Sequence, residues 1–329
     1  MAISLKTQKM LWGRAAGRCS KCRKDLYEDE TETDDPTLVG ENCHIVAESD
    51  DGPRANPEMP PERRNSYGNL ILLCRNDHRI IDTQPGEYTI ERLHQMKADH
   101  EAWVRQNLGL DEAKQHDDEQ YSAIVDEWEK LAHLASWTAW SSHVLGGDHP
   151  AMWKGLDEDL YALRDRLLTR VWPGRYPDLE NAFRNFRFVL QDFQETFREQ
   201  AESRGGDETL MTRRFYKIDE WNPERYRRLL QQYEYHVALV SDLMLELTRA
   251  ANLICDRVRQ NLKRSYRLHE GRLAVESGPY EDLSFKKWVV QYSQEERQKA
   301  IPYPGLESFL TERAKRDRSF GDGPVADAL

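Results

Sequence analysis

The sequence predicts an α+β protein in which a small cysteine-rich domain precedes an all-helical domain. Four of the five cysteines fall in the first quarter of the 329 residues, among short apolar segments separated by turn-forming residues. From about residue 119 onward, apolar residues recur three and four positions apart, which is the period of amphipathic helices. We therefore expect a first domain at 1–105, a polar linker at 106–118 and a helical domain at 119–329, within the usual size range of domains.

The composition predicts a soluble, cytoplasmic protein. The net charge of −11 argues against a generally basic surface for nucleic acid, although local basic patches can still hold phosphate. No apolar run follows the charges at the N-terminus, so no signal peptide is expected. No apolar stretch reaches the length of a membrane span, so we expect no membrane partner.

The helical half carries two segments with clear signals. One of them places a stripe of apolar side chains on a single helix face, namely Phe186, Leu190, Phe193 and Phe197. The other starts at Asn222 and Pro223, an N-cap followed by proline at the first helical position, and continues for about forty residues without proline or glycine. Cys255 lies in this segment as a small buried hydrophobic residue. Because such apolar seams seldom stay exposed, we expect the helical half to form a homo-oligomer or to bind a partner protein.

The clustered cysteines predict a structural zinc site. Cys19 and Cys22 form a C-x-x-C pair, which lets two thiolates face one tetrahedral ion. Cys74 follows an apolar strand and supplies a third thiolate. Cys43 and Asp77 are the candidates for the fourth ligand, and we assign Cys43 because zinc prefers thiolate or imidazole. The alternative is that Cys43 is buried without a ligand role.

Two histidines and an asparagine stand at the ends of the predicted strands. His44 closes one strand, Asn69 opens the next, and His78 follows in the segment NLILLCRNDHRIID. This order resembles the HNH endonucleases, which carry histidine, asparagine and histidine on a ββα-metal finger. The resemblance covers residues 10–105 and includes the C-x-x-C pair, GPR after the first histidine, H-x-x-I-D and the closing helix YTIERLHQMKADHEAWV.

The resemblance implies a metal-dependent endonuclease that hydrolyses phosphodiester bonds in DNA. In that family pattern, His44 would take the proton from the attacking water, a role that suits an imidazole near neutral pH. His78 would hold one divalent cation, Mg²⁺ or Mn²⁺, against the scissile phosphate. Asn69 would fix the loop between the strands and so orient His44, while Zn²⁺ would serve only to stabilise a domain with little core.

One position departs from the family pattern. Many relatives carry Asp or His directly before the first histidine as a second ligand for the catalytic metal, whereas this chain has Cys43, which we assign to zinc. His78 would then hold Mg²⁺ largely with water, a common arrangement for this ion, or with help from Glu41, Asp82 or His100.

Three arginines lie in the loop between the two histidines. Arg54, Arg63 and Arg64 are candidates for binding phosphate oxygens of the substrate. The alternative is that they are ordinary exposed charges of the loop.

The resemblance extends to HNH effector nucleases of bacterial antiphage defence, in which the nuclease is joined to a sensing or partner-binding domain. Two alternatives remain. The first is a zinc finger that binds nucleic acid without cutting it, but a complete set of His44, Asn69 and His78 argues against it, because binding alone requires no base. The second is a restriction endonuclease that recognises modified DNA through its helical half, for which the sequence identifies no aromatic base pocket.

Overall fold

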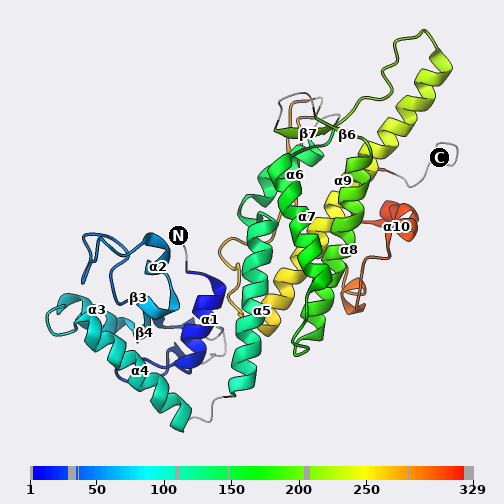
Figure 1. Ribbon diagram of the computed structural model, residues 1–329. Helices are drawn as coiled ribbons and strands as arrows, with labels where there is room; N and C mark the ends of the chain where they lie inside the picture. The colour runs from blue at the N-terminus through cyan, green and yellow to red at the C-terminus, as the bar shows by residue number, and fades with distance from the viewer. Residues whose placement is uncertain are drawn as a thin grey trace. The chain divides into compact units, whose positions relative to one another are not determined.

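The computed structural model describes residues 3–28, 35, 37–107, 111–146, 149–203, 208–280 and 282–321. The chain divides into two compact units, Met1–Asp126 and Glu127–Leu329 (Figure 1). The boundary falls inside helix α5 (Glu112–Leu131). The expected linker is therefore helical from Glu112 on, because the Asp111 carboxylate accepts a hydrogen bond from the backbone N–H of Lys114 and caps the first turn.

The first unit combines short antiparallel strands with helices. Its elements are α1 (Leu5–Arg14), β1 (Tyr27–Glu28), β2 (Thr37–Leu38), β3 (Gly40–His44), α2 (Pro61–Arg64), the 3₁₀ turn η1 (Tyr67–Asn69), β4 (Leu70–Cys74), α3 (Arg75–Thr83) and α4 (Ile90–Asn107). Strands β3 and β4 form an antiparallel hairpin in which Gly40 lies opposite Cys74 and His44 opposite Leu70. Helix α3 follows β4 without a connecting loop, so the end of the hairpin and the first turn of the helix are adjacent (Figure 1).

Strand β4 is the centre of the first unit's core. Its four residues from Leu70 to Leu73 have no exposed surface, and they pack with side chains such as Leu11, Leu26 and Ile81. Burial on both faces explains why this strand is a continuous apolar run rather than an alternating one. The strand ends at Cys74, whose sulfur accepts from the backbone N–H of Asp77 and starts α3.

The second unit is mainly helical but contains small sheets. Its helices are α6 (Trp137–Leu145), α7 (Lys154–Thr169), α8 (Pro177–Glu199), α9 (Pro223–Asn261) and α10 (Leu306–Glu312). A three-stranded antiparallel sheet has the order β5 (Ala151–Trp153), β7 (Thr209–Thr212) and β6 (Ala201–Glu202), and β8 (Val275–Ser277) pairs with β9 (Lys286–Trp288). The expectation of an all-helical domain is thus corrected, because strands of two to four residues are too short to show an alternating pattern. Mixed helices and small sheets agree with the α+β class.

Helices α8 and α9 pack side by side along much of their length (Figure 1). The predicted stripe on α8 is confirmed, because Phe186, Leu190, Phe193 and Phe197 are all fully buried. The predicted start of α9 is confirmed as well: the Asn222 side chain accepts from the N–H of Arg225, and Pro223 occupies the first turn. In the described part of the chain, no helix combines the length and the apolar character that crossing a membrane requires.

Candidate functional site

Four side chains of the first unit form a closed cluster of metal-ligand type. The ligand atoms of Cys19, Cys22, Cys74 and Asp77 all lie within 4.8 Å of one another. The first two come from the loop after α1, Cys74 from the end of β4, and Asp77 from the first turn of α3. Three sulfurs and one carboxylate oxygen provide the four ligands that a structural zinc site needs.

Hydrogen bonds already hold this cluster together. The Asp77 carboxylate accepts from the thiols of Cys19 and Cys74, each at 3.2 Å, and from the Lys21 ammonium at 2.7 Å. Burial would raise the pKa of Asp77, but the bonds from Cys22, Lys21, Cys19 and Cys74 together lower it below its ordinary range. Partial burial and the neighbouring Asp77 raise the pKa of Cys22 to about 12. A metal ion must therefore displace thiol protons when it binds here.

The structure places Asp77, not Cys43, in the fourth position, so that assignment is corrected. The register of the hairpin explains the difference. Gly40 lies opposite Cys74, whereas Cys43 lies opposite Ile71, three residues further along the strand. At about 3.3 Å per residue, this displaces Cys43 by about 10 Å from the end of the hairpin. Asp77 lies within one helical turn of Cys74 and reaches the cluster easily.

Cys43 belongs to a second cluster of metal-ligand type, with Glu41 and His78. The ligand atoms of these three residues also lie within 4.8 Å of one another. Glu41 and Cys43 are alternate residues of β3 and therefore point to the same face of the hairpin. Burial, together with the carboxylates of Glu41 and Asp82, raises the pKa of the Cys43 thiol.

His78 is held between two carboxylates. Its Nδ1 lies 2.6 Å from Glu41 Oε2, and its Nε2 lies 3.1 Å from Asp82 Oδ2. His100, the third residue considered as a helper for His78, is elsewhere. Its Nε2 contacts the carbonyl oxygen of Ala15 at 3.1 Å, and burial lowers its pKa. Of the three candidates, Glu41 and Asp82 contact His78, whereas His100 packs α4 against the end of α1.

His44 lies at the end of β3, where its Nε2 contacts Asn65 Oδ1 at 2.7 Å. In the structure, the amide oxygen of Asn65 faces Nε2 of His44. With this oxygen as acceptor, Nε2 carries the proton and Nδ1 is the basic nitrogen. Asn65 was not among the residues that the sequence predicts for the site. It lies in a loop rich in polar residues, and no spacing pattern distinguishes it from its neighbours.

Asn69 connects the two ends of the loop between β3 and β4. Its amide oxygen accepts from the N–H of Val46 at 2.9 Å, and its amide nitrogen donates to the carbonyls of Val46 and Arg64, each at 2.9 Å. The side chain is almost fully buried. These three bonds fix the backbone that directly follows His44.

The three loop arginines differ in their surroundings. The Arg54 side chain is buried and donates to the carbonyls of Ile45 and Ile81 and to the Asp82 carboxylate at 2.7 Å. Arg64 donates to the carbonyl of Glu48 and to Asp50, both at 2.5 Å. Both guanidinium groups therefore have internal partners. Arg63 is exposed, and within the described ranges no side-chain partner is found for it, so it best fits the expected phosphate-binding role.

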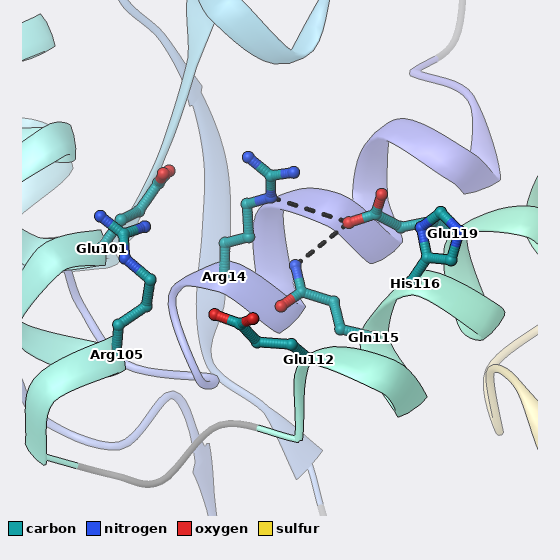
Figure 2. A pocket seen from close by; sticks show the side chains of 7 residues that line it. All are labelled: Arg14, Glu101, Arg105, Glu112, Gln115, His116 and Glu119. Atoms are coloured by element: carbon teal, nitrogen blue, oxygen red, sulfur yellow. Dashed lines mark hydrogen bonds and ion pairs between the residues drawn. The ribbon is translucent and has the colours of Figure 1, made fainter.

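A separate pocket of about 300 Å³ lies among α1, α4 and α5 (Figure 2). Three carboxylates, Glu101, Glu112 and Glu119, line it together with Arg14 and Arg105, and Arg14 pairs with Glu119 at 3.7 Å. None of the site residues expected from the sequence borders this pocket. Acidic and basic groups nearly balance within it, so its charge favours no particular ligand.

A scan of protein-family models finds none that matches this chain, and a search of curated proteins finds no match either.

Proposed function

We propose that this protein is a metal-dependent endonuclease of the HNH type, which hydrolyses phosphodiester bonds in DNA. The single observation that carries the proposal is the juxtaposition on one hairpin–helix unit. His44 ends β3, Asn69 fixes the loop behind it, and His78 on α3 meets Glu41 of the same strand. A binding module has no need for an oriented imidazole beside a cluster of metal-ligand type.

His44 is the proposed general base. With Asn65 accepting from Nε2–H, the lone pair on Nδ1 is available for the proton of an attacking water. The water oxygen bonds to phosphorus, its proton passes to His44, and the bond from phosphorus to the leaving oxygen breaks. The leaving oxygen then takes up a proton from solvent. Asn69 acts as a positioning residue, because it holds the backbone next to His44 rather than touching the substrate.

The residues Glu41, Cys43 and His78 would hold the catalytic metal ion. They fit such an ion because sulfur, nitrogen and oxygen donors converge, while the Glu41 and His78 side chains remain 42% and 30% exposed and accessible to a phosphate. Such an ion would supply positive charge to stabilise the developing charge on the phosphate. The cluster of Cys19, Cys22, Cys74 and Asp77 would hold Zn²⁺ as a structural ion.

Plasmid cleavage tests the proposal. Wild-type protein should nick or linearise plasmid DNA when a divalent metal ion is present and should not do so in excess chelator. His44→Ala should lose two to four orders of magnitude in rate, the usual contribution of a positioned base. DNA retention and thermal unfolding should stay unchanged. His94→Ala, which removes an exposed histidine of α4, is the matched control and should cleave normally.

Two outcomes would contradict the proposal in different ways. Undiminished cleavage by His44→Ala would place the base elsewhere. Retention of DNA without cleavage under any divalent metal ion would favour the zinc-finger binding module.

A second candidate function, restriction of modified DNA, has one observation in its favour. A pocket of about 410 Å³ in the second unit is lined by Trp140 and Trp153, with Asp159 and His133 beside them. Tryptophan rings can stack on a flipped base, and a carboxylate can accept from its amino group. Faster cleavage of base-modified plasmid, abolished by Trp153→Ala, would support this candidate. Equal rates on both plasmids would exclude it.

We also propose that the helical unit controls the nuclease, as an effector of antiphage defence would require. The proposed partner is a second copy of the chain or another protein. Light scattering across a concentration range tests self-association, and phage plating with wild type and His44→Ala tests defence. A strict monomer that protects no better than His44→Ala would contradict this assignment.

A further inference from the structure

Cys43 provides a thiol at a position of the proposed catalytic centre where oxygen or nitrogen ligands would suffice. Its sulfur lies in the same cluster as a carboxylate oxygen of Glu41 and a ring nitrogen of His78. The residue is 2% exposed, and its thiol makes only a weak contact of 3.4 Å with the carbonyl of Glu41. Because Asp77 completes the other cluster, the Cys43 thiol is available as a ligand here.

The donor set decides which metal ions this centre prefers. Mg²⁺ takes oxygen ligands in a near-octahedral arrangement and keeps several waters. Thiolate favours zinc and other transition metals, and imidazole suits Zn²⁺, Ni²⁺ and Fe²⁺ as well. One sulfur, one nitrogen and one carboxylate oxygen thus favour a transition metal over Mg²⁺.

We propose that Cys43 makes this centre a thiolate site for a transition metal of the zinc class, in preference to Mg²⁺. The inference rests on the proposed function for its catalytic meaning, but the metal binding can be measured without cleavage. When the ion binds, the Cys43 thiol loses its proton to solvent and a sulfur–metal bond forms, with no change of oxidation state. The chain then holds two transition-metal ions, one in each cluster.

The two carboxylates that contact His78 have different roles in this centre. An imidazole offers one nitrogen to a given ion, and the nitrogen that faces Glu41 is Nδ1. Nε2–H is then free to donate to Asp82, which Arg54 holds at 2.7 Å. Metal-binding histidines commonly donate their second N–H to a carboxylate that orients the ring. Asp82 is therefore a positioning residue, and Glu41 is a ligand.

The two clusters differ in how much room they leave around an ion. Cys19, Cys22, Cys74 and Asp77 supply four ligands, which closes a tetrahedral site. The Cys43 centre supplies three, which leaves a position for water or a phosphate oxygen, as catalytic zinc sites do. We expect the closed site to resist chelators and the open site to exchange its ion.

Titration of the metal-free full-length protein with Co²⁺, under reducing conditions, tests the inference by absorbance. Thiolate–cobalt bonds give charge-transfer absorption that carboxylate and imidazole ligands do not give. Wild type should show two equivalents, each with such absorption. Cys43→Asp should keep the first equivalent, lose the thiolate absorption of the second, and reduce the preference for Zn²⁺ over Mg²⁺, because an oxygen ligand replaces a sulfur ligand. Cys255→Ala, a buried cysteine of α9, is the matched control and should titrate like wild type.

Cys43 is buried, and a substitution there can disturb folding. A second variant at a partly exposed position therefore provides an independent test. Glu41→Gln changes a half-exposed side chain and should weaken the second equivalent while keeping its thiolate absorption. The inference is overturned if wild type binds only one Co²⁺ with thiolate absorption, or if Cys43→Asp titrates like wild type. If Co²⁺ binds through Cys43 but no DNA is cut, the proposed function fails and the metal site stands. If Mg²⁺ alone supports cleavage and Cys43→Asp cleaves as fast as wild type, the proposed function stands and the inferred thiolate site fails.

Discussion

At the scale of single residues, Asp77 is the side chain that completes the closed cluster. It accepts from two thiols and an ammonium, and it sits on the first turn of α3 beside Cys74. An aspartate can replace a thiolate here because the helix brings its carboxylate to the sulfurs at hydrogen-bonding distance.

Asp77→Ala should therefore remove the chelator-resistant zinc and lower the melting temperature of the first unit. The change deletes one of four ligands and leaves the Lys21 ammonium without its carboxylate. Asp77→Cys should retain zinc, since it supplies a fourth thiolate. Zinc content by mass spectrometry and thermal unfolding measure both effects, with Asp99→Ala on the exposed face of α4 as control. Retention of resistant zinc in Asp77→Ala would return the fourth ligand to Cys43.

At the scale of elements, the loop between β3 and β4 depends on one buried amide. Asn69 makes three hydrogen bonds to the backbone at 2.9 Å, two of them as donor. Asn69→Asp keeps the shape but loses both donated bonds and places a charge against two carbonyls. We expect it to lower the free energy of unfolding by roughly 2–3 kcal/mol and to reduce cleavage, because a buried unsatisfied group costs about this much.

Urea unfolding of the first unit measures the loss in Asn69→Asp. Asn56→Asp is the matched control, because Asn56 is exposed and accepts only a local bond from the N–H of Glu58. Equal stability of the two variants would show that the loop is held by other contacts.

Helix α9 carries a buried histidine whose burial predicts a pH effect. His236 is 7% exposed, its Nε2 has no hydrogen-bond partner in the described part of the chain, and burial lowers its pKa to about 4. The unfolded chain, with a pKa of about 6.5, binds more protons between these values. The stability of the second unit should therefore fall as the pH falls from 6.5 to 4, by up to about 3 kcal/mol.

His236→Phe should remove this part of the pH dependence, because phenylalanine fills the space and does not titrate. Urea unfolding at a series of pH values measures it, and His269→Phe is the exposed control. If His236→Phe keeps the slope of wild type, protonation of another group is responsible.

At the scale of the whole molecule, the two units differ in the groups that could stabilise them. Both clusters of metal-ligand type lie in the first unit, and the described residues of Glu127–Leu329 contain none. The second unit is held by helix packing, with Phe186, Phe193, Leu243 and Leu247 fully buried.

Calorimetry of the full chain should then show two transitions. Metal-free protein should melt at a much lower temperature than zinc-loaded protein in the first transition and within a few degrees of it in the second, because a metal ion bound at these clusters would contribute directly to folding of the first unit. Readdition of Zn²⁺ should restore the first transition. A single transition that shifts as a whole would mean that α5, which crosses the boundary, couples the units.

Local patterns determined a large part of this protein. The start of α9 at Asn222 follows from its cap and proline, and the buried stripe of α8 follows from the helical period. The sequence also located the cysteine-rich unit and predicted that Cys19, Cys22 and Cys74 lie together, and the structure confirms this grouping. These features depend on neighbours within a few residues, or on residue types with few alternative uses.

Tertiary structure alone decided the rest. Whether Asp77 or Cys43 joins Cys19, Cys22 and Cys74 depended on the register of β3 against β4. That register cannot be read from the composition. Asn65 beside His44 and Arg54 on Asp82 are contacts of an irregular loop, across 21 and 28 residues of chain. The path of such a loop is set by many weak hydrogen bonds acting together. Which side chains lie together as candidate ligands is therefore decided by where the backbone places them.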